Sequence, residues 1–154
     1  MSINRIGRAV RILSTPVGMD MTGYIGRLGP STGTHDPLHV RCVALEADGG
    51  CVVLAVCELL GLSDGVAGDI QRRAAARAGL PPESVVVCCT HTHSGPASIH
   101  LENCGTVDSR WLADTADLVV DAVVAAVEDL TPARLTLATG RCRAAFNRIA
   151  GHST

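Results

Sequence analysis

Two histidines stand one residue apart at the end of a strongly hydrophobic run. Residues 85 to 95 read VVVCCTHTHSG, so His91 and His93 follow directly on a run with strong strand character. Along an extended chain, residues i and i+2 point to the same side, so the two imidazoles would face one location. Imidazole is a preferred ligand of zinc and of several other divalent metals. The pair is therefore a candidate for metal binding or catalysis, and the alternative is that both rings bond local backbone groups or face solvent.

The residues after the histidines favour a turn. Gly95 permits a sharp bend and a close backbone approach, and Pro96 ends strand pairing, so the imidazoles would stay open to a cleft. Ser94 is adjacent to His93, but the GxSxG elbow of a serine nucleophile is missing and neighbouring residues of a strand point in opposite directions. We interpret Ser94 as a turn residue.

A catalytic zinc ion needs about three protein ligands and one open position. Glu58 is one candidate for a further ligand, but it could instead be a strand-end carboxylate with a backbone partner. His35 and Asp36 are two more, but they could instead form a turn. Spacing alone does not choose among the candidates for the remaining ligands, which are His35, Asp36, Glu58, His100, Glu102 and His152. Two alternatives stay open at this point. One is a metallohydrolase whose site is completed within the chain by His35, Asp36 or Glu58, and the other is a non-catalytic α/β binding module with the histidines at a pocket mouth.

The elements that would position the histidines belong to an α/β domain with a mixed β-sheet flanked by helices. The Asp-Gly-Gly sequence between the second and third strands predicts an antiparallel hairpin. A helix from Ser63 or Asp64 to Gly79 separates the third strand from the fourth, which predicts a right-handed crossover between parallel strands. Ligands bind at the carboxyl ends of such strands, where His91 and His93 stand. The predicted strands are 8–14, 38–47, 51–59, 84–90 and 133–140, and a long amphipathic helix runs from Asp108 to about residue 130.

A long loop over residues 23–37, GYIGRLGPSTGTHDP, is rich in glycine and contains two prolines. It shows no apolar periodicity, and such long loops are usually retained for function. A surface excursion without a role is the alternative reading of the same composition.

The composition bounds the class of protein. With 154 residues, 47% of them hydrophobic, and a net charge of -2, the chain is expected to form one soluble globular domain. Its thirteen basic residues are all arginine and form no run, which argues against a nucleic-acid partner or an acidic membrane surface. Neither a signal peptide nor a membrane helix is recognisable, so we expect a cytoplasmic location and a small-molecule or lipid partner.

The cysteines and the C-terminal residues each lead to a further expectation. The seven cysteines form an odd set, and several lie in apolar strand-like runs, so reduced thiols are expected. The last residues, RCRAAFNRIAGHST, end on polar residues without a closing helix or strand. We therefore expect an incomplete domain, whose uncovered apolar surface would favour self-association.

Several stretches resemble the neutral/alkaline non-lysosomal ceramidase family. They are TGYIGRLGPSTGTHDPLHVRCVALE, LLGL, PPESVVVCCTHTHSGP and FNR, in the order and spacing of the N-terminal part of that family's catalytic domain. The resemblance runs over nearly all of residues 1–154, and THTHSGP is its most specific stretch. It implies a zinc-dependent amidohydrolase that cleaves the N-acyl bond of ceramide into a fatty acid and a sphingoid base.

Site residues are carried over by position. The resemblance implies that His91 is a zinc ligand, that His93 lies beside the substrate carbonyl, and that Arg148 helps to hold the substrate. The resemblance thus gives the two histidines different roles, whereas their spacing alone would make both of them metal ligands. The family's other zinc ligands, a second His, a Glu and a Tyr, have no counterparts in this sequence, so the chain by itself is expected to be inactive. Glu58 stands where similar sequences carry Asp.

Overall fold

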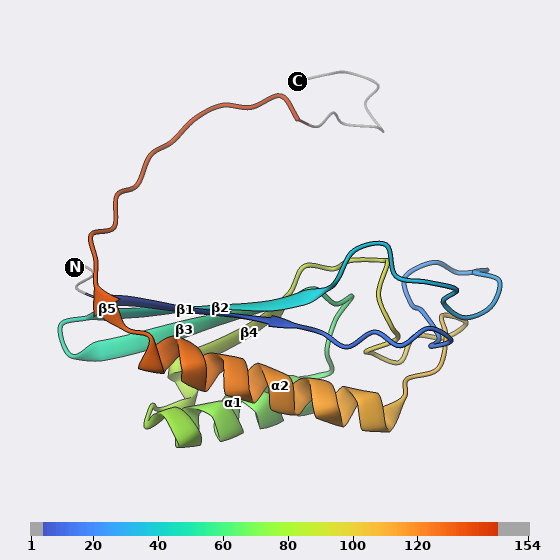
Figure 1. Ribbon diagram of the computed structural model, residues 1–154, viewed down its shortest axis with the longest axis horizontal. Coiled ribbons are helices and arrows are strands. Elements are labelled where there is room, and N and C mark those ends of the chain that lie inside the picture. The colour runs from blue at the N-terminus through green and yellow to red at the C-terminus, as the bar shows by residue number, and fades with distance from the viewer. Residues whose placement is uncertain (1–4, 145–154) are drawn as a thin grey trace.

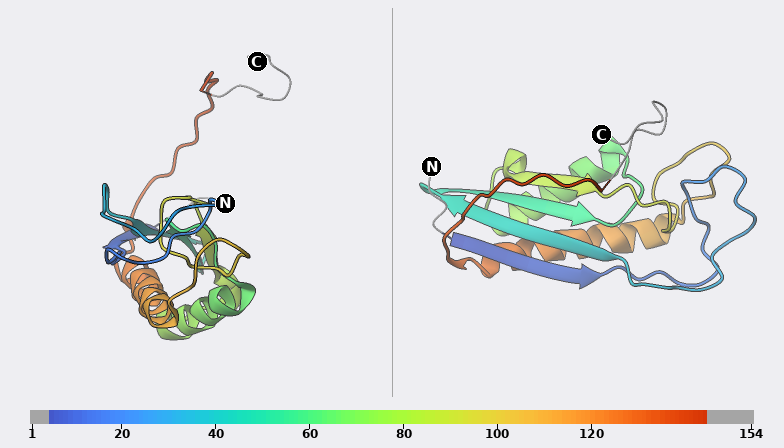
Figure 2. Two further views of the ribbon diagram at one scale, coloured as in Figure 1. Left: turned by 90° about the vertical axis from the view of Figure 1, so that its right-hand side faces the viewer. Right: turned by 90° about the horizontal axis from the view of Figure 1, so that it is seen from above.

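The structure is a computed structural model, and it describes residues 5–144. It consists of one mixed β-sheet with strand order β4-β3-β2-β1-β5 and two long helices packed on the same face of that sheet (Figure 1, Figure 2). An α/β class with a mixed sheet is therefore confirmed. The elements are β1 (Arg5–Ile12), β2 (His39–Ala47), β3 (Gly50–Cys57), α1 (Asp64–Ala78), the short 3-10 helix η1 (Pro82–Ser84), β4 (Val85–Cys89), α2 (Ser109–Glu128) and β5 (Thr131–Pro132).

The β2–β3 hairpin follows from its turn residues. Asp48 and Gly49 both have positive φ angles, 48° and 80°, as the tight turn of a two-residue hairpin loop requires. The register pairs Ala47 with Gly50 and continues to Val40 opposite Cys57. The expected antiparallel hairpin is confirmed.

Helix α1 carries the chain from β3 to β4. Ser63 caps its first turn through a side-chain oxygen that accepts from the backbone N–H of Val66, and Gly79 ends it in the left-handed conformation with φ 68°. The chain then enters β4, which pairs parallel with β3 from Val53 opposite Val85 to Cys57 opposite Cys89. The crossover between parallel strands is therefore as predicted.

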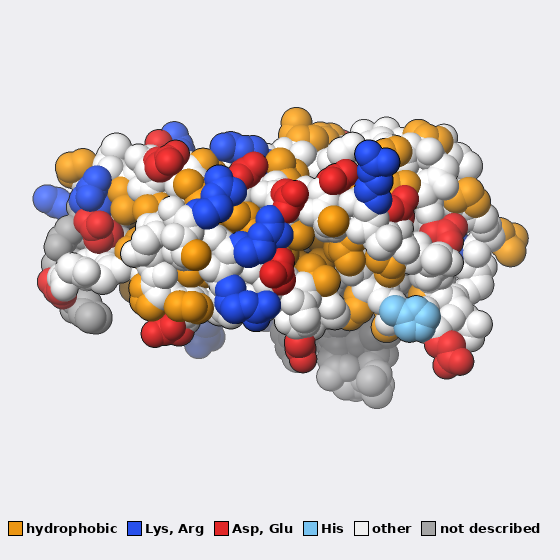
Figure 3. Space-filling view, turned by 90° about the horizontal axis from the view of Figure 1, so that it is seen from below, with side chains coloured by type: hydrophobic (Ala, Val, Ile, Leu, Met, Phe, Trp, Pro, Cys, Tyr) orange, Lys and Arg blue, Asp and Glu red, His pale blue; other side chains and the backbone are white. Residues whose placement is uncertain are grey.

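Helix α2 covers the middle of the sheet and completes the core. Its buried face is built from small and β-branched residues, among them Val119, Val120 and Ala126. Arginines of α1 pair with aspartates of α2 along their shared edge, for example Arg77 with Asp121 at 2.6 Å, and the helix side of the molecule shows these charges interspersed (Figure 3). No helix within residues 5–144 is both long and apolar enough to cross a membrane.

Two strand predictions need correction. The first strand begins at Arg5, three residues before the expected start at residue 8. The strand expected over 133–140 is not formed, because only Thr131 and Pro132 pair, with the start of β1. The alternating pattern of 133–140 is suited to a strand, but no strand within residues 5–144 pairs with it, and residues 133–144 are exposed without regular structure.

The face of the sheet opposite the helices is open and apolar. Strand pairing places Val43 and Leu54 opposite each other, and Val86 opposite Leu54 on the next strand, so these side chains share one face. Their exposed fractions are 38%, 42% and 44%. Parallel strands are usually buried on both faces, so this surface is unusual for the fold.

Close packing of β1 against α2 depends on Gly7. A Cβ atom at this position would stand 1.9 Å from the carbonyl oxygen of Ala126 and 2.9 Å from the amide nitrogen of Leu130. We therefore expect Gly7→Ala to push α2 away from the sheet and to lower the free energy of unfolding by about 1–3 kcal/mol, the usual cost of overpacking. Urea unfolding followed by circular dichroism measures this.

The matched control is Gly50→Ala, since the nearest atom to a Cβ at Gly50 is 3.7 Å away. Gly50 also lies in a strand, so its substitution should change stability by no more than about 0.5 kcal/mol. Equal effects of the two substitutions would contradict the role assigned to Gly7.

Candidate active site

The histidine motif begins where β4 leaves the sheet. The backbone N–H of Thr90 donates to the carbonyl of Cys57 at 3.0 Å, and that of His91 donates to the carbonyl of Leu59 at 3.0 Å. These bonds carry the pairing of β3 and β4 a little beyond the strands themselves. The motif is thus held against the segment that follows β3, at the carboxyl ends of the two parallel strands, where ligands bind in open α/β sheets.

His91 and His93 are neighbours in space. Their ring centroids are 5.0 Å apart and their planes meet at 75°. His91 has a φ angle of 62°, so the chain turns at this residue. The two rings therefore come together because the chain turns at His91. The expected alternation of side chains along an extended strand does not apply here.

The hydrogen bond of His91 sets its tautomer. Its Nδ1 lies 2.8 Å from the carbonyl oxygen of Leu60. Because a carbonyl oxygen only accepts, Nδ1 carries the hydrogen and the lone pair of a neutral ring is on Nε2. A histidine that binds metal through one nitrogen commonly donates from the other to such a carbonyl. The exposed side chain of His91 can therefore offer Nε2 to a ligand.

His93 is partly buried beneath the glycine-rich loop. The ring of Tyr24 stands edge-on to it, with centroids 5.1 Å apart. The segment just before the loop is joined to the residues just after the motif, since the backbone N–H of Ala97 donates to the carbonyl of Asp20 at 2.8 Å. The sequence reading did not single out these loop contacts, although the density of glycines in residues 23–37 was a signal of close backbone approach.

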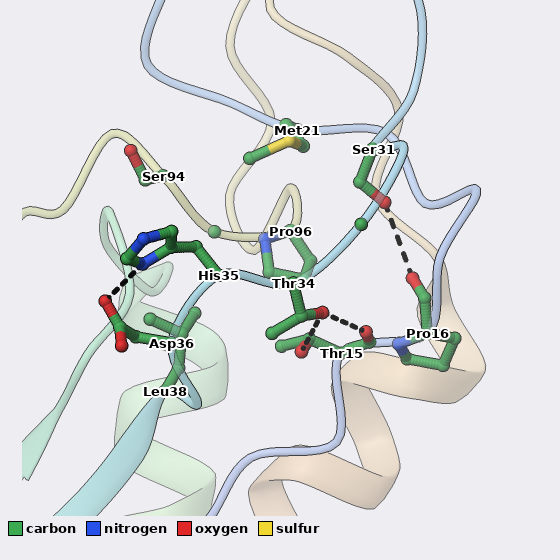
Figure 4. Close-up of a pocket in the computed structure, with 12 residues that line it drawn as sticks. Thr15, Pro16, Met21, Ser31, Thr34, His35, Asp36, Leu38, Ser94 and Pro96 are labelled. Carbon is green, nitrogen blue, oxygen red and sulfur yellow. Dashed lines mark hydrogen bonds and ion pairs between the residues drawn. The ribbon is translucent and has the colours of Figure 1, made fainter.

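A pocket of about 460 Å³ opens between the same loop and the turn after His93 (Figure 4). Apolar side chains and hydroxyl groups both line it, among them Met21, Leu38, Pro96, Thr34 and Ser94. Ser94 also ends the motif in a local turn, because its backbone N–H donates to Oγ1 of Thr92 at 3.2 Å. This agrees with its interpretation as a turn residue.

The described candidate ligands form no metal-binding cluster with His91. His35 and Asp36 bond each other at 2.6 Å on the rim of the pocket, and both side chains are largely exposed. His100 and Glu102 are exposed in the segment between the motif and α2. Among residues 5–144 the structure forms no cluster of three or more His, Cys, Asp or Glu side chains able to hold a metal ion. Arg148 and His152 lie outside the described residues.

Glu58 is engaged in an ion-pair cluster. Its carboxylate accepts from the backbone N–H of His39 at 2.7 Å and from the ring Nδ1 of His39 at 3.2 Å, and it pairs with Arg41. Burial opposes ionisation and raises the pKa of Glu58, but the hydrogen bonds from His39 and Arg41 together outweigh it and lower the pKa below its ordinary value. The interactions formed by Glu58 therefore join the start of β2 to the end of β3.

The lowered pKa of Glu58 predicts a pH-dependent contribution to stability. A carboxyl group with a depressed folded-state pKa stabilises the protein above its unfolded pKa, and this contribution is lost as the pH falls through the folded pKa. We expect Glu58→Gln to lower the free energy of unfolding at pH 7 by about 1 kcal/mol, the scale of a hydrogen bond. The difference in the free energy of unfolding between Glu58→Gln and the native chain should shrink as the pH falls through the folded-state pKa of Glu58.

Urea unfolding at pH 7 and at acidic pH provides this comparison. Glu128→Gln is the control, because Glu128 is an exposed carboxylate at the end of α2. A Glu58→Gln effect that is the same at both pH values would contradict a role for the ionised carboxylate.

Comparison with known proteins places the fold. Neither protein-family models nor curated protein sequences match this chain. Among solved structures, the neutral ceramidase from Pseudomonas aeruginosa matches with a TM-score of 0.73 and 24% identity over 86% of this chain. A ceramidase complexed with C2 matches with a TM-score of 0.66 and 22% identity, again over 86% of the chain. The chain spans 22% of the length of each. The resemblance seen in the sequence is therefore confirmed in the fold, which is that of a segment of neutral ceramidase.

Proposed function

We propose that residues 1–154 are the N-terminal portion of the catalytic domain of a zinc-dependent amidohydrolase similar to neutral ceramidase. Its reaction would be the hydrolysis of an N-acyl bond in a ceramide-like lipid, giving a fatty acid and a sphingoid base. One observation carries the proposal. In a chain with the fold of a neutral ceramidase segment, His91 and His93 stand side by side at the carboxyl end of a parallel strand, and the residues that follow them, Ser94 to Pro96, line a pocket.

His91 fits one ligand position of a zinc ion. The carbonyl of Leu60 holds Nδ1 and leaves Nε2 with its lone pair, as zinc requires. When bound, zinc acts as a Lewis acid that polarises a carbonyl and makes water more acidic. Zinc sites use about three protein ligands, so the described residues supply only part of the set. The rest is proposed to come from further sequence of the parent protein.

His93 is proposed to act on the substrate. Its ring lies beside that of His91 but is partly buried under the loop. From this position it could donate a hydrogen bond to the acyl carbonyl oxygen as negative charge develops there. Arg148 is proposed to orient the substrate by a hydrogen bond from its charged guanidinium group.

The substrate proposal agrees with the character of the pocket. Met21, Leu38 and Pro96 offer apolar contact, while Thr34 and Ser94 offer hydroxyl groups. A lipid amide has the same division between an apolar chain and a polar head. A cytoplasmic location remains our proposal.

Zinc binding tests the assignment of His91. We expect the purified chain to hold well under one zinc ion per chain by elemental analysis, because one imidazole is a weak site. Titration with zinc chloride should nevertheless shift the ring signals of His91 in NMR spectra. His91→Ala should abolish any zinc-induced shift of the neighbouring His93 ring signals, while His100→Ala, at another exposed histidine, should leave the zinc response unchanged.

Three outcomes would overturn the proposal in different ways. A full zinc ion per chain that is lost in His35→Ala or Glu58→Ala would indicate a self-contained metallohydrolase site. A His91 ring that does not respond to zinc would remove its ligand role. Hydrolysis of an N-acylsphingosine by this chain alone, abolished by a chelator and restored by zinc, would show that the chain needs no further ligands.

Self-association is a further part of the proposal. The open apolar face of the sheet exposes Val43 and Leu54 side by side. Because water contact with such a surface is unfavourable, two copies should associate through it. We expect sedimentation velocity to show dimers or larger species, and Val43→Glu with Leu54→Glu to shift the chain toward monomer.

The control for this measurement is Val17→Glu. Val17 is 63% exposed but lies in a loop away from the sheet face. If the native chain is monomeric, or if Val17→Glu dissociates it equally well, the sheet face is not the surface responsible.

A further inference from the structure

Arg27 bonds directly to the backbone of His93. Its Nη2 donates to the carbonyl oxygen of His93 at 2.8 Å, across 66 residues of sequence. Its Nη1 reaches the sulfur of Met21 at 3.2 Å, and its guanidinium carbon lies 5.3 Å from the ring centroid of Tyr24. A hydrogen bond from a charged donor is stronger than one between neutral groups, and stacking on the tyrosine ring restricts the arginine further. The Arg27 side chain is thus held at three contacts.

The loop backbone also limits the position of the His93 ring. A Cβ atom at Gly23 would lie 2.6 Å from Cγ of His93 and 2.7 Å from its Cβ. Gly23 has a φ angle of 108°, a conformation that residues with side chains rarely adopt. The backbone can therefore approach the imidazole only because residue 23 is glycine.

The segment that carries Arg27 is itself tied to the motif. Met21 and Pro96 form an antiparallel bridge, and the N–H of Thr22 donates to the carbonyl of Gly95 at 3.4 Å. The N–H of Arg27 donates to the carbonyl of Tyr24 at 3.3 Å, which closes a local turn. Residues 20–27 are thus held against the residues that follow the motif, and Arg27 is the residue of this segment that bonds to His93 itself.

We propose that Arg27 is a positioning residue that holds His93 in place beside His91. It acts through the carbonyl of residue 93 and through the ring of Tyr24, which in turn stands edge-on to the His93 imidazole. The glycine-rich loop then has a defined task, to set the location of the second histidine of the motif. The significance of this for catalysis rests on the proposed function, in which His93 faces the substrate, but the contact and its test do not.

The test follows the ring signals of His93 in NMR spectra of the folded, metal-free chain at one fixed pH, assigned by their loss in His93→Gln. In Arg27→Met, the His93 ring signals should shift by more than those of His39 or His100, because the carbonyl contact and the stacking on Tyr24 are both removed. Arg27→Lys keeps a charged donor and should return the signals part of the way to their native positions.

Arg5→Met is the matched control. Arg5 also donates a guanidinium hydrogen bond to a partly buried carbonyl, that of Leu130 at 2.7 Å, but far from the motif. It should affect stability without moving the His93 signals. Native His93 signals in Arg27→Met, or equal shifts in Arg5→Met, would overturn the proposal.

A second variant covers loss of folding. If Arg27→Met does not give a folded chain by circular dichroism, Arg27→Gln, which keeps a polar end but has no charge, replaces it with the same expected shift. Unmoved His93 signals in that variant also overturn the proposal. None of these readouts needs zinc or catalysis. The test of Arg27 can therefore succeed even if the proposed hydrolase function fails, and the hydrolase function can be confirmed even if the test of Arg27 fails.

Discussion

The parallel pairing of β3 with β4 is the constraint on which the site depends. Five consecutive residue pairs, from Val53 with Val85 to Cys57 with Cys89, align the carboxyl ends of the two strands. Beyond them, the carbonyls of Leu59 and Leu60 bond the backbone and the ring of His91. A shift of one residue in this register would turn the side chains of β4 to the opposite faces and would displace the histidines from their backbone partners.

The sheet has two unlike faces, because side chains alternate between the two sides along each strand. Val53 and Ala55 point inward and are fully buried under the helices, whereas Val52 and Leu54 point away from them and remain 49% and 42% exposed. A parallel pair is normally covered on both sides. The structure is therefore well packed on one side only, and the apolar outer face is the feature in which it differs most from a usual α/β domain.

The glycine-rich loop shows how a site can be built from segments that are distant in sequence. Arg27 and Tyr24 contact His93 across more than sixty residues. Each of these contacts is short-range, so it depends on the loop being held by the bonds of residues 20–22 to residues 95–97. Glycine at position 23 contributes by the absence of a side chain, which lets the loop backbone approach the imidazole.

The sequence by itself determined the local elements, because their signals are local. Ser63 and Gly79 bound α1, Asp48 and Gly49 form the hairpin turn, and the apolar run before His91 is a strand. Strand formation over 133–140 failed as a prediction because alternation describes a face, while a strand also needs a neighbouring edge to pair with, which only the tertiary structure supplies. The nearness of His91 and His93 was expected, but the turn at His91 and the bond to Leu60 that sets its tautomer were not. The bond of His91 to Leu60 and the contact of Arg27 with His93 join residues far apart in the chain. Spacing along the sequence carries no information on such contacts, because only the folded sheet brings these residues together.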